Sequence, residues 1–313
     1  MALAAALFEK IVVYAIFIII GFFAVRLHVM TFEDSKVLSR FALYFLTPCA
    51  MFDAFQYEFS MDRLTGMGIA AAGVLLCVLA FALLERLLAR RFKLSVVEYT
   101  SLEYPNSGNF MLPLVASVMG GDWVIYCCPC FLIICFLLFS HCKAVLSGEK
   151  RIRADMFYKN SVIIALVLGL VLFLLNIQIT GLAGDAISSL GSMMGPTYMF
   201  TVGMIIGNAD LKKIFSNKRA YIICAGRLIL CPLLAMAVFF VTGLLRIHPD
   251  APRFLLVVFL TAGAPTAVTI TQFTQLYRSV PEAEFASVIN ILSTILCLVT
   301  MPCMAYLYQL AAF

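Results

Sequence analysis

Charged side chains are scarce in this chain of 313 residues, because Asp, Glu, Lys and Arg together make up only 12% of it. Average soluble proteins carry about 25% charged residues, which keep their surfaces hydrated. Apolar residues reach 63%, and the mean hydropathy is +1.03. This composition excludes a soluble globular protein and indicates an integral membrane protein, with the lipid bilayer as its surroundings.

Sequence motifs of nucleotide-binding and catalytic sites are also missing. There is no Walker A sequence to support direct use of ATP, and no HExxH, paired-aspartate or nucleophile-elbow motif of an intramembrane enzyme. The three histidines, His28, His141 and His248, all lie near the ends of apolar runs. We therefore expect a protein that is not an enzyme and that holds no metal or cofactor, apart from a coupling H+ or Na+.

Most of the eleven cysteines lie inside apolar runs, including Cys77, Cys135 and Cys297. We interpret them as small, reduced packing residues rather than as ligands or a disulfide framework.

Apolar runs of about 20 residues, enough to cross the hydrocarbon core, indicate ten membrane spans. They cover residues 7–26, 36–56, 64–88, 94–120, 123–146, 158–177, 183–208, 218–245, 252–278 and 283–312. With the N-terminus outside, seventeen Lys and Arg residues lie at the inside ends and four at the outside ends, as the positive-inside rule requires. We predict a multi-pass plasma-membrane protein with both termini outside. The net charge of +5 is then explained by the basic residues at the inside ends of the spans. It gives no reason to expect nucleic acid as a partner.

Two of these runs are interrupted in the middle. The first break is Asn106-Ser107-Gly108-Asn109, and the second is Gly263-Ala264-Pro265-Thr266. Unpaired backbone groups cost several kcal/mol each in hydrocarbon, so such breaks persist only where protein or a watery cavity surrounds them. Paired breaks in the two halves of a membrane chain point to the binding centre of a transporter.

A short repeat relates the two halves of the chain. Pro48-Cys49-Ala50-Met51-Phe52 in the second run recurs as Pro196-Thr197-Tyr198-Met199-Phe200 in the seventh. Each half also breaks its fourth run, and five is odd, so the second half enters the membrane from the opposite side. We predict an all-α membrane protein of ten transmembrane helices in two inverted five-helix repeats, with broken helices 4 and 9 crossing. The first repeat covers residues 1–146, a basic cytoplasmic linker 147–157, and the second repeat 158–313.

The breaks supply the chemistry of a substrate site. A half-helix that restarts presents free N-H groups and the positive end of its dipole, which favour an anion without any formal charge. We expect the substrate to contact the residues of both breaks, namely Asn106, Ser107, Gly108, Asn109, Ala264, Pro265 and Thr266.

Arg227 is the one cation well inside an apolar run, at 218–245. A charge at that depth is a functional-site hypothesis, and a guanidinium can pair bidentately with a substrate carboxylate. In the alternative interpretation, Arg227 lies about two turns from the cytoplasmic end and snorkels there.

Three polar residues are candidates for ion coupling. Glu103 lies one turn before the first break and could carry a proton or ligate sodium, unless it is a helix-end carboxylate facing cytoplasmic water. Gln272 and Asn290 lie at helical spacings that could line the same cavity.

The segment from Asn106 to Leu114 (NSGNFMLPL) resembles the Asn-x-Gly and Pro-Leu signature of the auxin efflux carrier family, whose bacterial members include malate permeases. The second half agrees through Ala264-Pro265-Thr266-Ala267, Ser293-Thr294 and Thr300-x-Pro302. The resemblance implies ten spans in two inverted repeats, a crossover of helices 4 and 9, a scaffold domain and a transport domain, and secondary transport of small organic anions. Met111 stands where bacterial members often have glycine, and Asn109 where an aromatic residue is frequent.

We therefore expect a secondary active transporter of a mono- or dicarboxylate, such as malate or an auxin-like acid, working by alternating access at the crossover. A bile-acid-type sodium symporter or a cation/proton antiporter of related fold is the alternative, although an antiporter would be expected to place an acidic residue where Asn106 and Asn109 stand. A non-transporting membrane receptor is the third interpretation. A homodimer is one arrangement that the sequence allows.

Overall fold

The computed structural model describes residues 2–148 and 160–312, and within these ranges the chain is helical and contains no β-strand. This confirms the all-α class. The first half contains α1 (Ala2–Arg26), α2 (Phe32–Phe41), the π-helix η1 (Ala42–Leu46), α3 (Thr47–Asp53), α4 (Met61–Phe92), α5 (Val96–Glu103), α6 (Met111–Met119), the 3-10 helix η2 (Gly121–Tyr126), α7 (Cys127–Leu137), the π-helix η3 (Leu138–Cys142) and α8 (Lys143–Ser147).

The second half contains α10 (Ser161–Leu174), α11 (Gly181–Ser192), α12 (Met194–Asn208), α13 (Leu211–Ser216), α14 (Lys218–Ala225), the π-helix η4 (Gly226–Leu230), α15 (Cys231–Thr242), the 3-10 helix η5 (Leu244–Arg246), α16 (Ala251–Ala262), α17 (Val268–Tyr277) and α18 (Val280–Ala312). The predicted linker 147–157 lies almost wholly outside the described residues, so the predicted boundary between the repeats stays a prediction.

Prolines account for two of the wide π-helical turns. Pro48 and Pro232 are the second residues after η1 and η4, and a proline has no N-H to donate to the carbonyl four residues earlier. After η1, the hydroxyl of Thr47 donates to the carbonyl of Ala42 at 2.9 Å. The turn at η4 places Arg227 inside the protein, where it is fully buried.

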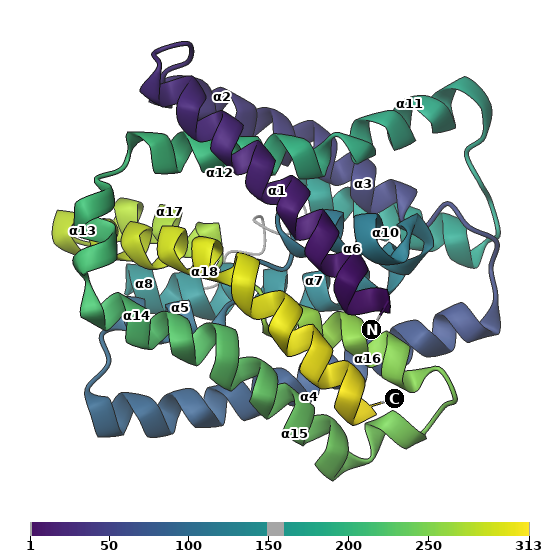
Figure 1. Ribbon diagram of the computed structural model, residues 1–313. Coiled ribbons are helices and arrows are strands. Elements are labelled where there is room, and N and C mark those ends of the chain that lie inside the picture. Colours follow the sequence, from purple (N-terminus) through teal and green to yellow (C-terminus); the bar gives the residue numbers. More distant parts are fainter. Residues whose placement is uncertain (1, 149–159, 313) are drawn as a thin grey trace.

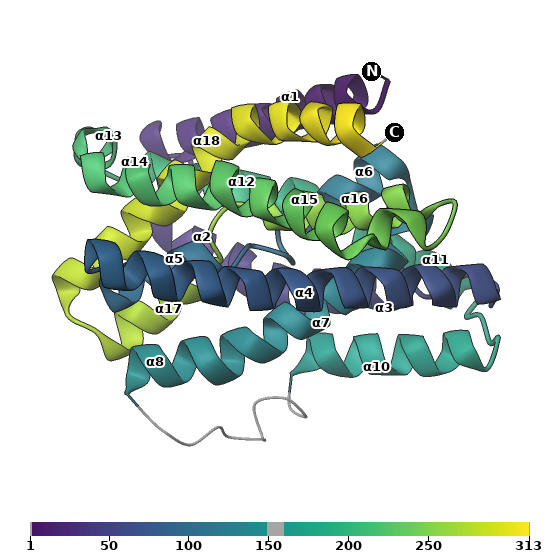
Figure 2. The same cartoon turned by 90° about the horizontal axis from the view of Figure 1, so that it is seen from below.

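The helices pack in two groups, and segments of the two groups alternate along the sequence. The α1 group consists of α1, α2, α3, α10, α11 and α12, and the α4 group consists of α4 to α8 and α14 to α18. The groups meet where α1 contacts α6 and α18 and where α12 contacts α6. Figure 1 shows α1 crossing α12, and Figure 2 shows α1 and α18 side by side at one face, with α8 and α10 at the opposite face.

Glycine allows α1 and α12 to approach closely. A Cβ atom added at Gly203 of α12 would lie 2.0 Å from the carbonyl oxygen of Ile18, and one added at Gly21 of α1 would lie 2.1 Å from that of Phe200. Small residues at such positions let backbones touch, which is a main source of helix association in lipid. The α1 group is therefore held by direct backbone contact.

Five helical stretches of the described chain are long and apolar enough to cross a membrane: Phe8–Arg26, Met61–Phe92, Gly121–Ser147, Lys218–Thr242 and Val280–Ala312. Two further apolar helices, α10 and α16, are shorter. The helices cover the ten predicted runs, but the number of membrane crossings and the outside position of the termini stay predictions.

Candidate functional site

Both predicted breaks fall between two short helices. Helix α5 ends at Glu103 and α6 begins at Met111, while α16 ends at Ala262 and α17 begins at Val268. The nonhelical segments are longer than the sequence predicted because the flanking residues are extended as well. Tyr104 has φ −101° and ψ 113°, and Ala267 has φ −62° and ψ 128°.

The two nonhelical segments pair with each other. The N-H of Asn106 donates to the carbonyl of Pro265 at 2.7 Å, and the N-H of Ala267 donates to the carbonyl of Tyr104 at 3.0 Å. Pro105 and Thr266 thus face each other in a single antiparallel bridge. Each segment satisfies backbone groups that the other would otherwise leave unpaired, which answers the cost of irregular backbone inside a membrane protein.

A backbone carbonyl of α5 and two side chains of α18 hold Thr266 in this bridge. Its hydroxyl donates to the carbonyl of Ser101 at 3.2 Å. Its N-H donates to the hydroxyl of Ser293 at 3.2 Å, and its carbonyl accepts from the amide of Asn290 at 2.8 Å. Asn290, predicted as a candidate for ion coupling, therefore lies at the second break.

Protein surrounds the bridge on the side of α16. All but two of the twelve residues of α16 are buried, as are Ala264, Thr266 and Ala267 in the segment that follows. A small cavity of about 20 Å³, room for about one water molecule, lies beside Tyr104 and Pro105. The second break is thus enclosed by neighbouring helices.

Two asparagine amides remain available at the start of α6. Asn106 and Asn109 are partly exposed, and neither side chain hydrogen-bonds to another residue of the described chain. Ser107 is buried, and Gly108 packs under the ring of Phe131, where an added Cβ would lie 2.8 Å from the nearest ring carbon. The amides stand near the N-terminal end of a half-helix, where a negative charge is favoured.

Arg227 reaches both broken helices from η4. Its guanidinium donates to backbone carbonyls at the end of α5 and at the end of α16, and the side chain does not extend to the cytoplasmic surface as snorkelling would require. Each of its N-H groups faces a carbonyl in this structure, so pairing with a substrate carboxylate would require releasing at least one of them. The predicted contact between Arg227 and the substrate stays a prediction.

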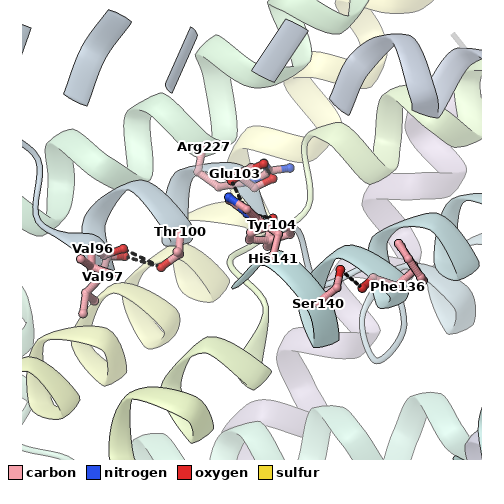
Figure 3. A network of polar contacts seen from close by, with 9 residues as sticks. All are labelled: Val96, Val97, Thr100, Glu103, Tyr104, Phe136, Ser140, His141 and Arg227. Atoms are coloured by element: carbon pink, nitrogen blue, oxygen red, sulfur yellow. Dashed lines mark hydrogen bonds and ion pairs between the residues drawn. The ribbon is translucent and has the colours of Figure 1, made fainter. Parts of the chain in front are cut away.

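Glu103 is buried instead of facing cytoplasmic water, with 8% of its surface exposed. Its Oε2 lies 3.8 Å from Nδ1 of His141 in η3, and the hydroxyl of Tyr104 lies 2.6 Å from the same nitrogen. Figure 3 shows these three residues gathered beside Arg227. Glu85 of α4 also interacts with Glu103. Sequence reasoning missed His141 because it placed that residue near a span end; its position within the apolar run 123–146 was the available signal.

Gln272 is the one predicted coupling residue that is not brought to the bridge region. It is exposed on α17, whereas Asn290 and Glu103 lie close to the crossing segments. No group of three or more His, Cys, Asp or Glu residues in ranges 2–148 and 160–312 could hold a metal ion, and all eleven cysteines are free.

Apolar helices packed around two paired helix breaks are the architecture of a membrane transporter. The family model described as membrane transport protein matches residues 6–150 and 150–305, which together cover most of the chain. The chain belongs to this family, that of the auxin efflux carriers, and the resemblance seen in the sequence is confirmed. The match also confirms a multi-pass membrane protein that functions in transport. A search of curated proteins found none that matches the chain.

Proposed function

We propose that this protein is a secondary active transporter of small organic anions, with a mono- or dicarboxylate such as malate, or an auxin-like acid, as substrate. The crossing of broken helices 4 and 9 forms its binding centre. The substrate contacts the first break through Asn106, Ser107, Gly108 and Asn109, and the second through Ala264, Pro265 and Thr266.

The observation that supports this proposal is the antiparallel bridge between Pro105 and Thr266. It brings together two segments that lie far apart in the chain; α6 begins five residues after Asn106, and α17 begins directly after Ala267. Each of these N-terminal helix ends carries about half a positive unit charge. Two of them attract a carboxylate while no formal cation has to be desolvated.

Alternating access requires two bodies that move relative to each other. We propose that the α1 group is the scaffold and that the α4 group, which contains both breaks, is the transport domain. The glycine-mediated contact between α1 and α12 supports a rigid scaffold, because backbone atoms already touch there.

Uptake by the purified protein in proteoliposomes tests the proposal. We expect labelled malate, or an auxin-like monocarboxylate, to accumulate above the external concentration when a proton or sodium gradient is imposed. A ligand-induced shift of the thermal unfolding midpoint without accumulation would identify a receptor instead. Movement of sodium or protons without any organic anion would identify a cation/proton antiporter.

Replacing Glu103 with glutamine tests proton coupling. Glutamine keeps the size of the side chain but cannot titrate, so accumulation driven by a pH gradient is expected to be lost, while exchange of labelled for unlabelled substrate persists. The comparison of gradient-driven uptake with exchange in the same proteoliposomes measures this. Glu284→Gln is the matched control, because Glu284 is exposed and pairs with Lys213 away from the bridge. Undiminished accumulation by the Glu103 variant would remove this residue from the coupling mechanism.

A further inference from the structure

The guanidinium of Arg227 has a full set of backbone partners. Nε donates to the carbonyl of Ala264 at 3.1 Å. One terminal nitrogen donates to Leu102 at 2.8 Å and to Glu103 at 3.3 Å. The other donates to Thr261 at 3.4 Å and to Ala262 at 2.5 Å. Arginine has five N-H donors, and five carbonyl oxygens receive them.

Four of these carbonyls belong to the C-terminal ends of α5 and α16, and that of Ala264 lies two residues beyond α16. The last carbonyls of a helix lack partners in the helix itself, and each end carries about half a negative unit charge. Two such ends meet at Arg227, so its single positive charge matches their sum. Because the side chain is 0% exposed, its charge depends on protein groups, and these carbonyls are the groups that accept its hydrogen bonds.

The five carbonyls form a cage around the guanidinium of Arg227. Neighbouring side chains close the remaining sides of this carbonyl cage. The thiols of Cys231 and Cys297 lie 3.6 Å and 3.7 Å from the carbonyls of Leu102 and Gly263. The ring of Phe81 lies over the guanidinium, with 5.8 Å between Cζ and the ring centroid, a cation–π distance. Residues of α15, α18 and α4 thus complete the cage, in addition to the carbonyls of α5 and α16.

Carbonyls at half-helix ends and in unwound segments are the groups with which broken-helix transporters hold a coupling Na+. We propose that Arg227 is a resident cation in such a cage. It joins the C-terminal ends of both broken helices, occupies the place where a sodium ion would bind, and lets the crossover function without sodium there. This proposal rests on the proposed transport function, and it makes Arg227 a positioning residue that does not touch the substrate.

Chemical rescue tests the resident cation without relying on transport. Arg227→Ala removes the cation and leaves its cage, so we expect a lower thermal unfolding midpoint in detergent. Guanidinium ion at millimolar concentration should raise the midpoint of this variant by several degrees, and sodium should raise it by less. The wild-type protein and Arg40→Ala, which replaces an exposed arginine of α2, should show no increase. Equal responses of all three proteins would overturn the proposal.

Arg227→Lys keeps the experiment decisive where the alanine variant does not fold. Lysine retains the charge but offers three donors from a single point, so it cannot reach all five carbonyls. We expect a lower unfolding midpoint and a lower maximal uptake rate, with the KM for the substrate unchanged. A raised KM with an unchanged maximal rate would instead show that Arg227 contacts the substrate.

Uptake by the wild-type protein completes the test. When a pH gradient drives uptake, initial rates are expected to be the same if sodium is replaced by choline on both sides of the membrane, and dependence on sodium under that gradient would overturn the proposal. If no organic anion is transported at all, the proposed function fails, while the unfolding midpoints still decide whether Arg227 is a resident cation.

Discussion

Replacing Asn106 with alanine is expected to reduce the initial rate of organic-anion uptake by at least roughly tenfold, while the protein stays folded. A hydrogen bond to a charged group contributes about 1.5–3 kcal/mol, and about 1.4 kcal/mol corresponds to a factor of ten. The amide of Asn106 has no hydrogen-bond partner among the described residues, so removing it breaks no bond of the resting protein. Its backbone N-H, which pairs with Pro265, is retained in alanine.

Asn208→Ala is the matched control for this substitution. Asn208 is exposed at the end of α12, and its side chain has no hydrogen-bond partner within the part of the chain that the structure describes. Both variants should have the unfolding midpoint of the wild type, and only the Asn106 variant should lose uptake. Wild-type uptake by the Asn106 variant would count against a substrate site at the first break.

Gly203→Ala should produce the largest loss of stability. The new methyl group would lie 2.0 Å from the carbonyl oxygen of Ile18 and 2.8 Å from its carbonyl carbon, both backbone atoms that cannot move aside alone. Helices α1 and α12 would have to separate along their contact. Overpacking of this kind costs about 1–3 kcal/mol, and more where the backbone must shift. Thermal unfolding in detergent, followed by circular dichroism, measures the effect.

Gly68→Ala separates this clash from the general effect of replacing a helical glycine. Gly68 lies in α4, and an added Cβ there would meet no atom within 4 Å. Alanine is favoured over glycine by about 1 kcal/mol in a helix. The Gly68 variant should therefore be as stable as the wild type or more so. Similar losses in both variants would show that the α1–α12 contact tolerates separation.

The sequence was informative wherever local chemistry decides the structure. Gly108, Gly263 and Pro265 interrupt apolar runs, and they predicted where α5 and α16 end to within a few residues. The apolar runs themselves coincide with helices because a helix pairs its backbone groups within the segment, as a bilayer requires. The extension of the nonhelical segments to Tyr104 and Ala267 was not predictable, since it depends on hydrogen bonds between the two breaks.

The features of the site that the sequence did not predict depend on contacts between distant segments. Arg227 donates to carbonyls that are up to 125 residues away in the chain. Every residue has a backbone carbonyl, so a sequence does not indicate which carbonyls accept these hydrogen bonds. The approach of His141 to Glu103 depends on how α7 and η3 pack against α5, which apolar periodicity does not specify. For both residues the sequence identified a polar group in an apolar run, and only the packing shows its partners.

The bridge between the two breaks has a consequence for biosynthesis. Thr266 and its partner Ser101 are 165 residues apart in the chain, so the first break leaves the ribosome long before the segment that pairs with it. Until residues 263–267 have been inserted, the polar backbone around Asn106 lacks its hydrogen-bond partners. It must then be shielded from lipid by water, by the insertion machinery or by other helices. The assembly of the crossover is therefore a late event in the maturation of this protein, and a chain truncated after α8 is expected to be recognised and degraded.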